Sequence, residues 1–138
     1  MKKLTIGLLI AFLMTACSDN WSQEVFKAYD DGKPEIVRVY DREHRWVREI
    51  HYYESGQVSM EGSVKDGQRE GEWVSYFYDG KVQSSGFFER GVRTGPAKVY
   101  HENGNLFMEG DYRDGHQTGL WKYYDEQGYL LKTVDYGD

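Results

Sequence analysis

The feature that most constrains the fold of this chain is a 24-residue spacing of its glycines. Three successive units carry glycine in the same four columns, without insertion or deletion: Gly56, Gly62, Gly67 and Gly71; Gly80, Gly86, Gly91 and Gly95; Gly104, Gly110, Gly115 and Gly119. Gly32 and Gly128 extend the first column at either end. A fixed period of this length indicates a repeat architecture, in which each unit is one supersecondary element stacked on its neighbours. The complete units are 50–73, 74–97 and 98–121, with partial units on either side.

Large side chains follow the same register. One column consists of Tyr52, Tyr76, Tyr100 and Tyr124, and another of Val58, Val82, Leu106 and Leu130. Trp73 and Trp121 share a column in which the middle unit has Ala97. We expect these columns to form ladders of like side chains across a sheet. The alternative is that the tyrosine column, Trp73 and Trp121 present anchors to a partner, since Tyr and Trp are favoured at interfaces.

Each unit has the pattern of a β-hairpin. Between Val58 and Val64 the even positions are apolar or small and the odd positions polar, which is typical of a strand with one buried face. The second strand, around 71–78, carries aromatics on both faces, so its buried face stays open. Type I′ turns are predicted at Asp66-Gly67, Asp79-Gly80, Asn103-Gly104 and Asp114-Gly115, and Gly56, Gly80, Gly104 and Gly128 are expected to be structural turn residues.

Glycine also recurs inside the strands, at Gly62, Gly86 and Gly110. A glycine within a strand marks either a bulge or a neighbouring group lying close over the backbone. Beside Ala97 the lost indole leaves a gap, which would admit a partner's side chain or be filled by Phe87 and Phe88, large residues where the first unit has Ser63 and Val64.

These patterns predict an all-β fold. One hairpin cannot bury its apolar face alone, so three or more units must stack. We expect an elongated, single-layer antiparallel meander of about eight to ten strands, roughly 40 Å long. This repeat domain spans 32–138, preceded by a tether over 17–31. The segment 21–29 is the one place where a short helical turn is expected.

From Tyr100 to Tyr124 the motif Tyr-x₃-Gly-x-Leu-x₃-Gly-x-Tyr-x-Asp-Gly-x₃-Gly-x-Trp-x-x-Tyr resembles the MORN-repeat variant found in YwqK-type antitoxins of toxin–antitoxin systems. The resemblance covers about 50–136. It implies an extended antiparallel sheet of hairpins and a role in protein association. Ala97, preceded by Pro96, departs from the tryptophan column of the family pattern.

The N-terminus has the features of an export sequence. Lys2 and Lys3 precede an apolar run, 4–14, that is too short to span a bilayer as a helix. Thr15-Ala16-Cys17 then resembles a lipobox, which predicts a signal peptide over 1–16 and a lipid anchor on Cys17. The alternative is an ordinary signal peptide cut near Ala16. We expect a lipid-anchored envelope protein, and Ser18 after the cysteine resembles the outer-membrane type if the host has two membranes.

Net charge and cysteine content limit the partners and the disulfide bonds that are expected for this chain. Cys17 is the only cysteine, so no intramolecular disulfide can form. Loss of the signal peptide removes two lysines and changes the net charge from −6 to −8. An acidic surface is repelled by nucleic-acid phosphates, so we expect no nucleic-acid partner. The unknown protein partner is instead expected to be basic, because opposite charge speeds encounter.

No residue pattern points to catalysis. The four histidines, His44, His51, His101 and His116, lack the spacing of a metal site, and we expect neither metal nor cofactor. No nucleophile motif occurs, and glycoside hydrolysis would need two carboxylates flanking a cleft. The sequence therefore favours a non-enzymatic protein-binding or scaffolding module on the envelope. The alternatives are an antitoxin that neutralises a partner toxin, and a protein that binds or hydrolyses envelope glycans.

Overall fold

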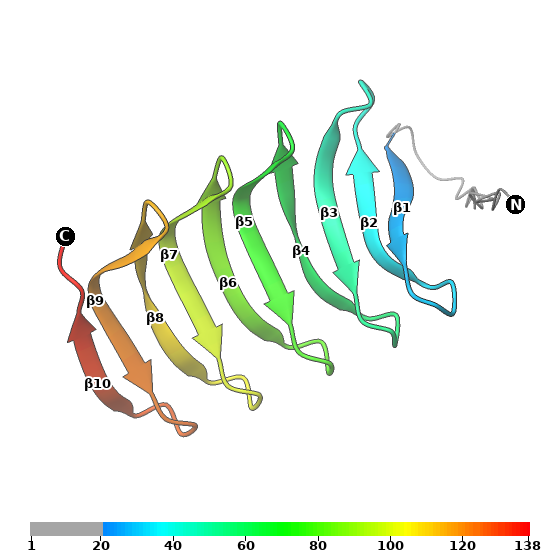
Figure 1. Cartoon of the computed structure of the whole chain (residues 1–138). Coiled ribbons are helices and arrows are strands. Elements are labelled where there is room, and N and C mark those ends of the chain that lie inside the picture. The colour runs from blue at the N-terminus through cyan, green and yellow to red at the C-terminus, as the bar shows by residue number, and fades with distance from the viewer. Residues whose placement is uncertain (1–20) are drawn as a thin grey trace, which may run out of the picture.

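The computed structural model describes residues 21–138, which form one ten-stranded sheet. Each strand pairs antiparallel with its neighbours in the sequence, so the strands lie in chain order in a single layer (Figure 1). The strands are β1 (Ser22–Ala28), β2 (Pro34–Tyr40), β3 (Trp46–Tyr52), β4 (Val58–Lys65), β5 (Gln68–Tyr76), β6 (Val82–Glu89), β7 (Val92–Tyr100), β8 (Leu106–Arg113), β9 (His116–Tyr124) and β10 (Leu130–Asp135). The predicted all-β meander is confirmed.

The sheet begins earlier than the glycine register indicates. Ser22–Ala28 forms the edge strand β1, which pairs with β2 through contacts such as Val25 opposite Val37. The helical turn expected at 21–29 is wrong, because so short a segment gains little as an isolated helix, whereas β2 offers its backbone hydrogen-bond partners. Part of the expected tether is thus sheet. The predicted signal peptide, Cys17 and Ser18 lie outside the described residues.

The hairpins use two kinds of turn, one at each end of the strands. Asp66 and Gly67 have φ of 51° and 77°, as a type I′ turn requires, and Asp114-Gly115 repeats this conformation. At the opposite end only the glycine of Asp79-Gly80 has positive φ. Its N–H donates to the Phe77 carbonyl at 2.9 Å, and the Phe77 N–H donates to the Lys81 carbonyl at 2.8 Å.

This second pattern is a type I turn followed by a left-handed glycine. The type I′ prediction is therefore wrong for Asp79-Gly80 and Asn103-Gly104. The reason is that the side chains of Asp79 and Asn103 accept hydrogen bonds from the N–H groups two residues ahead, at 3.1 and 2.9 Å. Such bonds stabilise an ordinary turn around the Asx residue.

The core lies on both faces of the sheet, and its largest part is a row across the middle of one face. The buried hydrophobic residues among 21–138 are Val37, Val39, Val64, Trp73, Ala97 and Trp121. Successive cross-strand partners in the row are Gly62, Trp73, Gly86, Ala97 and Gly110. Because no second layer of described residues covers the sheet, an indole is buried here by lying flat over a neighbouring strand.

Candidate binding surface

The register divides the predicted surface residues between the two faces of the sheet. Side chains alternate along a strand, and directly paired residues share a face. Trp73 and Trp121 therefore lie on one face, which we call the tryptophan face. The tyrosine column, Tyr52, Tyr76, Tyr100 and Tyr124, lies on the other, the tyrosine face. Trp73 and Trp121 are only 4% and 1% exposed, so neither offers a free anchor.

The two tryptophans are structural ladder residues. The indole of Trp73 lies against Gly62 and donates its Nε1–H to the Ser63 carbonyl at 2.9 Å. Trp121 lies against Gly110 in the same way and donates to the Asp111 carbonyl at 3.1 Å. Of the two explanations given for a glycine inside a strand, a neighbouring group lying close over the backbone therefore applies to Gly62 and Gly110.

In the middle unit, a side chain other than tryptophan covers the strand glycine. The guanidinium of Arg93 lies beside Gly86, and its Nη2 is 3.3 Å from the position that a Cβ would take if Gly86 had a side chain. Phe88 shares the tryptophan face and meets Trp73 edge-on, with ring centroids 6.4 Å apart. Phe87 belongs to the opposite face and is 37% exposed. Arg93, rather than Phe87 and Phe88, thus occupies the space over Gly86 that an indole at position 97 would fill.

Arginines and aromatic rings alternate along the tryptophan face from β5 to β9. The Arg69 guanidinium carbon lies 4.0 Å from the ring centroid of Trp73 and 5.4 Å from that of Phe88. That of Arg93 lies 5.7 Å from Phe88 and 4.9 Å from Tyr112. Tyr112 in turn meets Trp121 at 5.2 Å. Cation–π attraction stabilises such a row.

Sequence reasoning missed these arginines, although their positions contain the necessary information. Arg45, Arg69 and Arg93 share one column of the 24-residue register. Burial lowers the pKa of the Arg69 guanidinium, while Glu49 raises it and the charge of Arg93 lowers it. An arginine nonetheless stays protonated at neutral pH. The face therefore holds two neighbouring positive charges.

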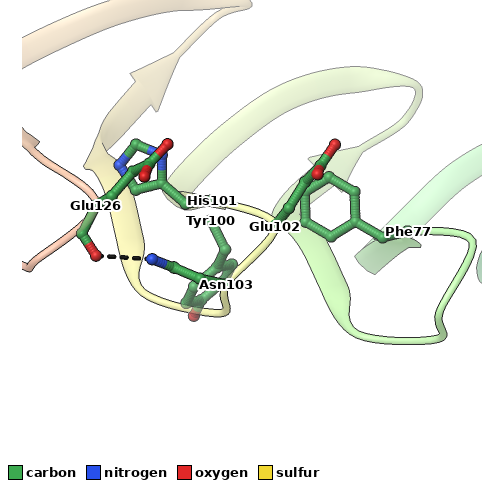
Figure 2. Close-up of a pocket in the computed structure, with 6 residues that line it drawn as sticks. All are labelled: Phe77, Tyr100, His101, Glu102, Asn103 and Glu126. Carbon is green, nitrogen blue, oxygen red and sulfur yellow. Dashed lines mark hydrogen bonds between the residues drawn. The ribbon is translucent and has the colours of Figure 1, made fainter.

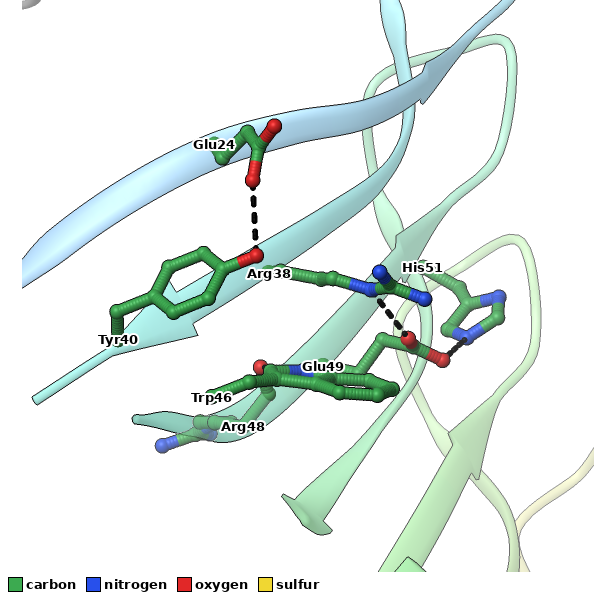
Figure 3. Close-up of polar contacts among 7 residues, drawn as sticks. All are labelled: Glu24, Arg38, Tyr40, Trp46, Arg48, Glu49 and His51. Carbon is green, nitrogen blue, oxygen red and sulfur yellow. Dashed lines mark hydrogen bonds and ion pairs between the residues drawn. The ribbon is translucent and has the colours of Figure 1, made fainter. Parts of the chain in front are cut away.

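A polar cluster marks the N-terminal end of the same face (Figure 3). Arg38 lies between the rings of Phe26 and Trp46, with its guanidinium carbon 3.3 and 4.0 Å from their centroids. Its Nε–H donates to Glu49 at 3.4 Å, and the other oxygen of Glu49 lies 2.8 Å from His51 Nε2. The carboxylate of Glu49 is thus shared between two partners within the sheet.

On the tyrosine face, two of the four column residues pair with carboxylates. The hydroxyls of Tyr76 and Tyr124 each donate to a glutamate, Glu61 and Glu109 respectively, at 2.9 Å. Burial, and then the bond to Glu61, raises the pKa of Tyr76. These pairs support the interpretation of the tyrosine column as a structural ladder, although its rings remain partly exposed.

A second ladder joins the hairpin loops. The hydroxyls of Tyr29 and Tyr53 each donate at 2.7 Å to a carbonyl one unit ahead, those of Tyr52 and Tyr76. Phe77 occupies this column without a hydroxyl. A hollow of ≈ 470 Å³ lies here between Phe77 and Tyr100, lined also by His101, Glu102, Asn103 and Glu126 (Figure 2). Asn103 closes one side by donating to the Glu126 carbonyl at 2.7 Å.

Among residues 21–138, no group of three or more His, Cys, Asp or Glu side chains is arranged to hold a metal ion. The four histidines are spread over β3, β9 and two loops. Within the same span, no helix has the length and apolar composition needed to cross a membrane.

Comparison with known families agrees with the repeat. The MORN repeat variant matches at residues 48–66, 69–90 and 93–114. The chain carries MORN repeats. The second and third matches begin and end 24 residues apart, which is the register of the glycine columns. MORN repeats are commonly protein- or membrane-binding modules and are generally non-catalytic. None of the curated proteins compared with the chain matches it.

Proposed function

We propose that this chain is a lipid-anchored envelope protein whose MORN repeats form a non-catalytic protein-binding or scaffolding module. The observation that carries the proposal is the single-layer sheet, in which both faces of ten strands are available for contact. A compact enzyme domain closes a cleft around its reacting groups. Here the side chains that would attract notice as catalytic are paired with one another, as Tyr76 is with Glu61 and His51 with Glu49.

The partner can be sought with the intact protein. The full-length, affinity-tagged chain, extracted with detergent from envelopes of its own host, should retain a partner in stoichiometric amount. The matched control is Gly110→Val, because a side chain at this glycine collides with Trp121 and disturbs the sheet. Capture by the wild type and loss in the control are expected. If the wild type retains no protein, the binding proposal fails.

The anchor has its own experiment. Cys17 would carry the lipid, and each buried CH₂ of an acyl chain contributes about 0.8 kcal/mol to membrane attachment. Cys17→Ser should therefore move the protein from the membrane fraction to the soluble fraction. The variant keeps residues 1–16 unchanged, so that any difference in fractionation is due to Cys17 alone. The measurement is fractionation followed by immunoblotting. Unchanged sedimentation with membranes would contradict a lipid anchor at this residue.

A further inference from the structure

The tryptophan face has an uneven charge. Over β4–β9 the register places Arg69 and Arg93 on this face, but no aspartate or glutamate. Acidic side chains of the same strands, such as Glu61 and Glu109, lie on the tyrosine face or beside the turns. The part of this face over β4–β9 is thus positive, although the whole chain carries a charge of −6. The adjoining strand β3 carries Glu49 on the same face, where it is already paired with Arg38 and His51.

Arg69 and Arg93 differ from the other arginine that stacks on this face. Arg38 has Glu49 within 3.4 Å, whereas no carboxylate among residues 21–138 lies within 4.0 Å of the guanidinium of Arg69 or Arg93. The Nε of Arg93 is buried and finds no acceptor among the described residues. A guanidinium has five N–H donors. A carboxylate from outside cannot reach the buried Nε, so it would pair with the outer Nη donors of the half-buried side chain.

We infer that Arg69 and Arg93 form a paired carboxylate-binding site for an acidic segment of the partner protein, an inference that rests on the proposed binding function. Each guanidinium would hold one carboxylate through two parallel N–H donors, which is the strongest geometry available to such a pair. Phe88 lies between the two guanidinium groups and offers an apolar surface to the residue between the acids.

The distance between Arg69 and Arg93 indicates which backbone conformation the bound acidic segment would adopt. Arg69 and Arg93 are one repeat apart, which is two strand spacings or roughly 9.6 Å. In a polyproline II helix, residues three apart lie on the same side at about 9.3 Å. An extended β-segment would turn such residues to opposite sides. The site therefore fits a segment with two acids three residues apart in the polyproline II conformation, running across the strands.

The negative charge on the tyrosine face does not prevent an acidic segment from binding to Arg69 and Arg93. At physiological ionic strength, charges separated by more than about 8 Å are largely screened. The carboxylates on the tyrosine face then weaken the approach of an acidic segment only slightly, while the two guanidinium groups act at contact distance. Binding should weaken as salt is added, because the carboxylates must reach partly exposed arginines.

The experiment uses the full-length chain in detergent micelles and a fluorescent, proline-rich peptide with two glutamates three residues apart. Fluorescence anisotropy should detect binding that weakens about tenfold in Arg69→Gln and likewise in Arg93→Gln. Arg45→Gln is the matched control: Arg45 stands in the same register but pairs with Asp41 at 2.7 Å, and its loss should leave binding unchanged. A peptide with glutamines in place of the glutamates should bind at least tenfold more weakly.

Further variants separate charge from folding. Arg69→Lys retains the charge and should keep part of the affinity, and the melting temperature of each variant shows whether its sheet is intact. Equal weakening by Arg45→Gln would overturn the site, as would absence of peptide binding to the wild type. Inorganic phosphate and anionic vesicles are tested in the same way. If either binds through Arg69 and Arg93 while the peptide does not, the occupant of the site is not an acidic protein segment. If Arg69→Gln still captures the envelope partner, this inference fails while the proposed function stands.

Discussion

Gly110 shows how one residue type can decide the packing of a single-layer sheet. A Cβ at this position would overlap the ring atoms of Trp121, and Trp121 is 1% exposed. Gly110→Ala must therefore displace the indole. We expect the free energy of unfolding to fall by about 1–3 kcal/mol, measured by urea denaturation followed by circular dichroism.

Gly86→Ala is the matched control for that change. It stands in the same column, but its Cβ would meet the flexible end of Arg93 at 3.3 Å. A guanidinium can shift where an indole wedged against the backbone cannot, so the loss at Gly86 should be clearly smaller. Equal losses at the two glycines would mean that the tryptophan is not what excludes a side chain from Gly110.

Phe77 offers a substitution that should stabilise the protein. Its column supplies a hydroxyl at Tyr29 and Tyr53, each donating to a carbonyl one unit ahead at 2.7 Å. Phe77→Tyr would direct the same group to the Tyr100 carbonyl, beside the hollow in Figure 2. We expect the free energy of unfolding to rise by about 0.5–1.5 kcal/mol.

The reverse substitution tests the same bond where it already exists. Tyr53→Phe should lower stability by a similar amount, because it leaves the Tyr76 carbonyl without this donor. Thermal unfolding of both variants and the wild type provides the comparison. A destabilised Phe77→Tyr protein would show that the hollow cannot place a hydroxyl as the neighbouring units do.

Within the strands, the pairs between tyrosine and glutamate make stability depend on alkaline pH. The pKa of Tyr76 is raised in the folded protein by burial and by its bond to Glu61, relative to the ordinary value of 10.0. A raised folded-state pKa contributes stability that is complete below the unfolded-state pKa and is lost as pH rises through the folded-state pKa. The wild type should therefore lose stability as pH rises above about 10.

Tyr76→Phe isolates the contribution of one strand to this behaviour. The variant lacks the titrating hydroxyl, so its free energy of unfolding should fall less steeply with pH than that of the wild type over the same alkaline range. Urea titrations at several pH values measure the two slopes. Parallel slopes would mean that burial and the bond to Glu61 do not raise the pKa of Tyr76 in the folded protein.

Elements differ in how well sequence patterns predict them. Asp66-Gly67 was predictable because two adjacent residues tolerant of positive φ are enough to specify a type I′ turn. Asp79-Gly80 has the same residue types but a different turn, since the Asp79 side chain accepts a bond from the Lys81 N–H. The strand Ser22–Ala28 was missed because it has no repeat motif and gains its conformation only by pairing with β2.

Across the whole molecule, strand contacts follow the chain. Substantial contacts join only strands that are adjacent in sequence. The stability of such a protein is approximately a sum over its repeats and the interfaces between neighbours. A chain ending at Tyr100, which lacks β8, β9 and β10, should therefore remain folded, with Trp73 still protected by its own unit.

The measurable consequence is a smaller unfolding transition. The dependence of unfolding free energy on urea should fall by roughly a third, because it scales with the surface exposed on unfolding. Circular dichroism should still report β-structure at low urea. A truncated chain without β-structure would show that the sheet folds as one indivisible unit rather than repeat by repeat.

The sequence by itself determined the repeat, the hairpins and the antiparallel order, because glycine spacing, turn residues and period-two alternation are all properties of a short stretch of chain. Only the tertiary structure decided which side chains meet. In β5, Gly71 and Glu72 form a bulge that places Trp73, rather than Gly71, opposite Gly62. That pairing buries the indole on one face and leaves the tyrosine column on the other. The pairing of β6 with β5 and β7 places Arg69 and Arg93 on either side of Phe88, and this register depends on bulges that residue spacing alone does not reveal.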